Sequence, residues 1–226
     1  MRIVTLLLCL LLAAPVCAGP VVDALYALED PAQRAALLTE LKERADAGDA
    51  RAQYWLGRAY HDLLPIDQRD FPAARGWLER AEANGHAGAA VMLGRIHERG
   101  FTVPADRAQA AVHYQRAFEL GAAAAAFDLA RLAFAQEPRD DVAIARWLDA
   151  GARGGHPGSM MLLARLHASG TVVAADAVEA LKWAILAREA GGGAAALELL
   201  REIAAQVPET GHEEARTRAR AWLEAQ

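Results

Sequence analysis

The sequence predicts an all-α protein built from a repeated pair of helices. Its 226 residues are 54% hydrophobic but only 6% aromatic, and most of the apolar residues are alanine and leucine, which lose little side-chain freedom in a helix. A Leu-x-Arg triplet also recurs along the chain at intervals of 34 to 37 residues. A period of this length is typical of stacked helical repeats.

Four series of residues keep this interval in step. They are Leu56, Leu93, Leu129, Leu163 and Leu199; Asp70, Asp106, Asp140 and Asp176; Gly85, Gly121, Gly155 and Gly191; and Trp77, His113, Trp147 and Trp183. Each glycine is 10 residues before the next arginine and each aspartate 15 before the next glycine, but the arginine-to-aspartate interval varies from 9 to 12. Insertions are tolerated in loops and not inside packed helices. Each repeat is therefore predicted to contain helix A, a turn of variable length, helix B and a tight glycine turn.

Local residue chemistry supports these boundaries. Each aspartate of the series precedes an alanine-rich stretch, where its carboxylate can cap the free N–H groups at the start of helix B. Each glycine follows that stretch, where a left-handed residue can end a helix. The residue after the repeated leucine is small at Gly57, Gly94, Ala130 and Ala164. We therefore expect a neighbouring helix to approach closely there.

The repeats divide the chain into predicted segments. Residues 19–48 form N-terminal capping helices, of which the second begins at Pro31. Repeats follow at residues 49–85, 86–121, 122–155 and 156–191, and a degenerate C-terminal repeat spans 192–226. In that last repeat, helix A is expected from Ala195 to Gln206, and a final amphipathic helix is expected to run to Leu223. Terminal repeats depart from the pattern because one face meets water instead of a neighbour.

Residues 1–18 have the pattern of a secretory signal peptide. Arg2 supplies a positive charge, an apolar run extends from Ile3 to Leu12, and a small-x-small pattern ends at Ala18, after which cleavage is expected. The apolar run is too short to be a permanent membrane anchor. The alternative is a lipoprotein attached to the membrane through Cys17. We expect a periplasmic or secreted protein whose mature form has lost both cysteines, so no disulfide would stabilise it.

One set of motifs recurs within the repeats. The pattern A-x-x-x-L-G-x-x-Y occupies Ala52 to Tyr60, and A-x-x-W-x-x-x-A-x-x-x-G occupies Ala74 to Gly85. The pattern G-x-x-V-x-x-D occupies residues 100–106 and 170–176, and the third repeat lacks this glycine turn. Over roughly residues 31–226 the chain resembles the Sel1-like repeat proteins, relatives of the tetratricopeptide repeats. The resemblance implies a right-handed α/α superhelical solenoid of about five helix-pair repeats, with an N-terminal capping helix, that serves as a scaffold for other proteins.

The sequence carries no pattern typical of catalysis or metal binding. Five of the seven histidines fall on repeat positions: His86, His97, His113, His156 and His167. There is no His-Glu-x-x-His pattern and no cysteine pair for a metal. Gly155–Ser159 has the composition of a loop but lacks the glycine-flanked serine of a nucleophile elbow. We therefore expect no enzyme activity, no cofactor and no metal.

The arginine series is the pattern most suited to binding a partner. Arg58, Arg95, Arg131, Arg165 and Arg201 occupy the same position of each helix A. In the related tetratricopeptide repeats this position faces the concave groove, which would arrange the arginines as a ladder for the carboxylates of an extended partner. The alternative is that each arginine pairs with an acid of its own chain, as Arg58 would with Asp62.

A second row of side chains precedes the arginines by one helical turn: Tyr54, Val91, Phe127, Met161 and Leu197. By the same resemblance these residues would line the groove with apolar contacts, and the alternative is that they belong to the core. The resulting expectation is an exported, monomeric scaffold that binds a protein partner. A net charge of -5 argues against nucleic acid, and membrane association is expected only if Cys17 is lipidated.

The sequence is also compatible with other functions. A periplasmic immunity or regulatory protein that blocks one target would need the same surface. Cysteine-rich Sel1-like proteins have been linked to β-lactam binding and weak hydrolysis, but they carry a disulfide in each repeat, and the mature chain expected here has no cysteine. A glycan-binding module would need an aromatic stacking platform, and the sequence offers none beyond its core tryptophans.

Overall fold

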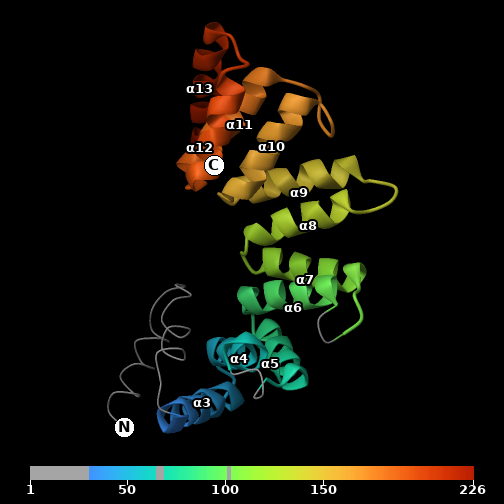
Figure 1. The fold of residues 1–226 in the computed structure, drawn as a ribbon, viewed down its shortest axis with the longest axis vertical. Coiled ribbons are helices and arrows are strands. Elements are labelled where there is room, and N and C mark those ends of the chain that lie inside the picture. Colours follow the sequence, from blue (N-terminus) through green and yellow to red (C-terminus); the bar gives the residue numbers. More distant parts are fainter. Residues whose placement is uncertain (1–30, 65–68, 101–102) are drawn as a thin grey trace. The chain divides into compact units, whose positions relative to one another are not determined.

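The computed structural model describes residues 31–64, 69–100 and 103–226 (Figure 1). Within these ranges the chain is entirely helical, with eleven α-helices, one π-helical turn and no strand. The chain divides into two compact units, one ending at Leu120 and the other spanning Gly121–Gln226. The predicted signal peptide and first capping helix lie outside the described residues.

The first unit contains two A/B helix pairs preceded by a capping helix. Its helices are α3 (Pro31–Asp46), α4 (Ala50–Arg58), α5 (Phe71–Ala83), α6 (Ala87–Arg99) and α7 (Arg107–Glu119). The π-helical turn η1 (Ala59–Leu63) continues α4. Helix α4 pairs with α5 and α6 with α7, while α3 packs on α4 and α5 packs on α6. The predicted helix-pair repeat is thus confirmed in this unit.

The second unit continues the pattern and departs from it at the C-terminal end. Its helices are α8 (Ala124–Phe134), α9 (Asp141–Arg153), α10 (Pro157–Ser169), α11 (Ala177–Glu189), α12 (Gly193–Ala204) and α13 (Glu209–Glu224). Helix α8 pairs with α9 and α10 with α11. Helices α12 and α13 both pack on α11 and make few contacts with each other. The last two helices therefore do not close into a pair like the others.

Some boundaries differ from the predicted ones by a few residues. Helix α12 begins at Gly193, two residues before the expected start at Ala195. Helix α10 begins at Pro157, so most of the segment Gly155–Ser159 is the first turn of a helix and not a loop. Proline is favoured in a first turn because its missing N–H would have no helical partner there.

The aspartate series caps the B helices as predicted. Asp70 Oδ1 accepts a hydrogen bond from the backbone N–H of Ala73 (2.9 Å), and Asp140 does the same for Ala143 (2.9 Å). Asp106 and Asp176 each accept from two backbone N–H groups of α7 and α11. The glycine turns are also confirmed, with φ of 86° at Gly85 and similar positive values along the series. Each B helix thus starts and stops at residues that recur in the sequence.

Two A helices begin at an imidazole in place of a carboxylate. Nδ1 of His86 and Nδ1 of His156 each accept a hydrogen bond from the backbone N–H three residues later, at 3.2 Å in both cases. The glycine two residues after each histidine makes room for the ring, since a Cβ at Gly88 or Gly158 would lie 3.1 or 2.8 Å from Cε1 of the imidazole. The motif His-x-Gly therefore encodes these caps.

Each capping imidazole also contacts an aromatic ring of the preceding helix A. The ring of Tyr54 stacks on His86 with centroids 4.2 Å apart and planes 17° apart. Phe127 contacts His156 at 5.3 Å with the planes tilted by 47°. These contacts fix the direction of two side chains from the second row of predicted groove residues.

The small residue after the repeated leucine lies where helices A and B meet. A Cβ added at Gly57 would lie 2.8 Å from Cγ of Leu78, and one at Gly94 would lie 2.6 Å from the ring of Tyr114. Ala130 and Ala164 are fully buried at the same position in the second unit. The predicted close approach of the helices is confirmed.

Replacing Gly94 by alanine should destabilise the protein, whereas replacing Gly76 should stabilise it. The new methyl group at position 94 meets the buried, rigid ring of Tyr114, and overpacking of this kind costs about 1–3 kcal/mol. Gly76 lies inside α5 with no atom within 4 Å of its added Cβ, so G76A gains about 0.5–1 kcal/mol of helix propensity. Urea unfolding measures the free energy of unfolding of both variants. An equal change in this free energy for G94A and G76A would contradict the close-contact explanation.

The imidazole caps should make the protein less stable as the pH falls. Burial lowers the pKa of His86 and of His156 below the usual histidine range, so the folded state favours the neutral ring, whose unprotonated Nδ1 accepts the capping bond. As the pH falls, these histidines become protonated in the unfolded chain at a higher pH than in the folded protein. The stability that the neutral rings contribute is therefore fully present above pH ~6.5 and is lost as the pH drops below it.

Thermal unfolding between pH ~7 and ~5 tests this pH dependence. The double variant H86N/H156N keeps a capping side chain and should lose less stability on acidification than the wild type. The double variant H86A/H156A should melt at a lower temperature at both pH values. An unchanged pH dependence in H86N/H156N would show that other groups cause it.

Candidate functional site

The first unit brings four of the predicted groove residues around one pocket. Tyr54 and Arg58 enter it from α4, and Val91 and Arg95 enter it from α6. The pocket has a volume of about 340 Å³. It is also lined by His61, Asp62, Gly88, Met92, Ile96 and Arg99. We call this site the α4–α6 pocket.

Arg58 is held in place by its own chain. It donates to both carboxylate oxygens of Asp62 at 2.9–3.2 Å and more weakly to the hydroxyl of Tyr54 at 3.4 Å. Burial alone would lower the pKa of Arg58, but the hydrogen bonds that it donates to Asp62 and Tyr54 prevail and raise the pKa above its usual value. The predicted pairing within the chain is therefore confirmed for this arginine, which is half-buried and leaves little charge for a ligand.

Arg95 and Arg99 differ from Arg58 in this respect. Both are exposed, and within the described ranges neither forms a hydrogen bond or an ion pair. They lie one helical turn apart on α6, so their guanidinium groups reach the same side of the pocket. With Arg58 neutralised by Asp62, these two cations give the pocket a positive rim on a chain whose net charge is -5.

His61 and Asp62 are pocket residues that sequence reasoning did not identify as site residues. The π turn η1 presents both of them beside α6. Both ring nitrogens of His61 are buried without a hydrogen-bond partner in the described residues, and burial lowers the pKa of the imidazole. The ring packs edge-on against Phe71 at 5.6 Å. At neutral pH His61 therefore contributes an uncharged wall to the pocket.

The sequence carries a signal for this turn in the length of the first repeat. The interval from Arg58 to Asp70 is 12 residues, one more than in the second and fourth repeats. Part of the extra length is taken up in η1, where Leu64 N–H donates to the carbonyl of Ala59, five residues back (3.0 Å). Single π turns inside α-helices are frequent at functional sites.

The corresponding residues of the second unit are more dispersed. Phe127 and Met161 are half-buried, and Leu197 is exposed. Arg131 pairs with Asp128 at 3.0 Å. Arg165 lines a pocket of about 360 Å³ between α10 and α12, together with Leu199, Glu202 and Gln206. Arg201 is exposed on α12 and does not line that pocket.

The described residues hold no group of three or more His, Cys, Asp or Glu side chains arranged to bind a metal ion. Among the helices of the described residues, none is both long enough and apolar enough to cross a membrane.

Comparison with known proteins identifies the repeat. The Sel1 repeat family matches residues 50–86, 87–121 and 157–192. A comparison with curated proteins finds no match.

Solved structures provide a second comparison. A Sel1 repeat protein from Oxalobacter formigenes is 21% identical, with a TM-score of 0.67 over 90% of this chain and 87% of its own; at this identity the likeness concerns the fold alone. A protective antigen of uropathogenic Escherichia coli with an SLR fold is 29% identical, with a TM-score of 0.61 over 68% of this chain.

This chain spans only 33% of the length of that antigen. Sel1 repeats form helical scaffolds that typically mediate protein–protein interactions. The matched repeats, the successive helix pairs and the two similar structures agree with one another. Together they identify the chain as a Sel1-like repeat protein.

Proposed function

We propose that this protein is an exported scaffold that recognises a protein partner through the exposed side of its A helices and acts by binding, not by catalysis. The α4–α6 pocket carries the proposal, because it joins residues of two successive repeats in a single recognition site. Arg58, already paired with Asp62, orients the pocket wall, and the two exposed cations of α6 remain available to a ligand.

The pocket chemistry favours one kind of partner surface. Its floor is apolar, with Ile96 buried and Val91 and Met92 half-buried, and the stacked ring of Tyr54 forms one wall. An apolar side chain of the partner fits this floor, while a neighbouring carboxylate reaches the guanidinium groups at the rim. Arginine and tyrosine are enriched among the residues that contribute most to protein–protein binding.

Export is the second part of the proposal and is supported by the sequence of residues 1–18. The positive residue, the apolar run and the small-x-small ending together form the pattern of a cleavable signal peptide. A partner of the exported protein is therefore expected in the cell envelope or outside the cell.

Reversing the charge of the pocket rim should weaken partner binding. With R95E/R99E as bait, capture of a partner from an envelope extract should fall, and the affinity for that purified partner should drop at least ~10-fold, because two charge-assisted contacts become repulsive. Both residues are exposed, so the fold should be preserved, which circular dichroism checks.

R75E is the control, since Arg75 lies on the surface of α5, outside the pocket, and forms a surface ion pair with Glu79 at 3.3 Å. It should leave the affinity within ~2-fold of the wild type, because exposed ion pairs contribute little. If R95E/R99E binds as tightly as R75E, with the same salt dependence, the α4–α6 pocket is not the recognition site.

The mature protein should begin at residue 19. Mass spectrometry of the protein purified from the source cells should show loss of residues 1–18, and fractionation should place it outside the cytoplasm. A protein that retains Met1, or one that carries a lipid on Cys17 and stays with membranes, would contradict this prediction.

A further inference from the structure

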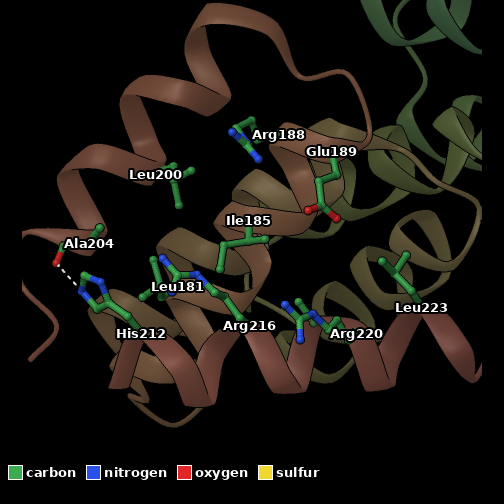
Figure 2. Close-up of a pocket in the computed structure, with 11 residues that line it drawn as sticks. Leu181, Ile185, Arg188, Glu189, Leu200, Ala204, His212, Arg216, Arg220 and Leu223 are labelled. Carbon is green, nitrogen blue, oxygen red and sulfur yellow. Dashed lines mark hydrogen bonds between the residues drawn. The ribbon is translucent and has the colours of Figure 1, made fainter. Parts of the chain in front are cut away.

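The C-terminal end of the second unit contains a groove outside the predicted site. Helix α11 forms its floor, and α12 and α13, which make few contacts with each other, form its walls. The groove has a volume of about 350 Å³. Figure 2 shows its lining residues, with α13 along one wall and Leu200 and Ala204 on the other. We call it the C-terminal groove.

The two walls are fixed by contacts at separate places. Nε2 of His212 lies 3.0 Å from the carbonyl oxygens of both Ala204 and Val207, which ties the start of α13 to the end of α12. Farther along α13, Arg218 forms ion pairs with Asp176 and Glu179 of α11 at 3.0 and 3.3 Å. Helix α13 is therefore bound to α11 and to the end of α12, while the space between the helix walls stays open.

The groove combines an apolar floor with a cationic rim. Leu181 is buried and Ile185 half-buried at the floor, while Leu223 is 49% exposed at the open end. Three arginines surround this surface: Arg188, Arg216 and Arg220. Figure 2 shows Arg216 and Arg220 rising from α13 toward the same space that Arg188 borders from α11.

The charge of the rim is largely uncompensated. Arg216 pairs with Glu213 on its own helix. Within the described ranges, Arg188 and Arg220 make neither a hydrogen bond nor an ion pair. Among the described residues that line the groove, Glu189 is the one acid. A chain of net charge -5 thus carries a local excess of positive charge over exposed apolar side chains.

We propose that the C-terminal groove binds an acidic amphipathic peptide, with an apolar anchor side chain on Ile185 and Leu223 and carboxylates on Arg188 and Arg220. Arginine binds carboxylates in a two-pronged geometry that suits this role. A volume of about 350 Å³ is at the low end for ligand sites, which fits one or two side chains and is too small for a lipid acyl chain. The apolar floor does not suit a nucleic-acid backbone.

This inference is independent of the proposed function. The groove lies in the second unit and shares no residue with the α4–α6 pocket. Either site can therefore fail its test without affecting the other.

The test uses a short fluorescein-labelled peptide with two leucines one helical turn apart, flanked by glutamates. A matched peptide carries glutamine in place of each glutamate. Fluorescence anisotropy with the full chain should show saturable binding of the acidic peptide, weakening as salt is added, and at least ~10-fold weaker binding of the glutamine peptide. A photo-crosslinker on one leucine should label residues of α11, α12 or α13.

Variants separate the groove from general attraction to arginine. R188E/R220E should lower the affinity for the acidic peptide at least ~10-fold, and L223A about 5-fold through lost apolar contact. R153E reverses an exposed last-turn arginine of α9 that lies outside the groove and should change the affinity less than ~2-fold. R95E/R99E should leave crosslinking to α11–α13 unchanged.

Several results would overturn the proposal. They are equal binding of the two peptides, a loss of affinity in R153E as large as that in R188E/R220E, crosslinks confined to α4 and α6, or no saturable binding. Flotation of the chain with anionic vesicles that R188E/R220E abolishes, without peptide binding, would assign the groove to a lipid surface instead. R188Q/R220Q removes the charge without reversing it. Its affinity for the acidic peptide should fall between that of the wild type and that of R188E/R220E, which checks that the effect does not come from misfolding.

Discussion

The close approach of each helix A to its helix B is the constraint on which the repeat depends. Gly94 meets the ring of Tyr114, and Gly57 meets Leu78, at distances that leave no room for a methyl group. Because successive residues point about 100° apart around a helix, burying Leu93 and Gly94 turns the next residue, Arg95, toward solvent. The exposure of Arg95, Arg131 and Arg165 is therefore a geometric consequence of the buried leucine and the small buried residue that precede each of them.

Most of the fold could be predicted because its signals are local. The aspartates that cap α5, α7, α9 and α11 act on N–H groups two or three residues away, and the glycine turns need only a positive φ. A series of such signals in step fixes the helix ends. The imidazole caps are encoded equally locally, by His-x-Gly, but the shared repeat position of His86 and His156 did not by itself predict a capping role.

The features that could not be predicted depend on packing between helices. The spacing offers the Arg58–Asp62 ion pair as one of two alternatives, and the structure adopts it, whereas no acid of the described residues reaches Arg95. Spacing alone does not decide between these outcomes, because they depend on where the neighbouring turns and helices place the acids. The opening between α12 and α13 has a similar origin, since α13 packs on α11, with Arg218 on the capping aspartate Asp176. Periodicity predicts that a last pair of helices exists, but not that it stays open.

The division of the arginines into paired and unpaired groups determines where recognition can occur. Arg58 would have to exchange Asp62 for a partner's carboxylate, so the net gain on binding would be small. Arg95, Arg99, Arg188 and Arg220 have no acidic partner among the described residues to give up on binding. Each borders an apolar floor that excludes water once a ligand is bound, which strengthens the ion pair. The net charge of -5 also disfavours non-specific attraction of a ligand carboxylate to the chain. The net negative charge therefore adds to the selectivity of these sites.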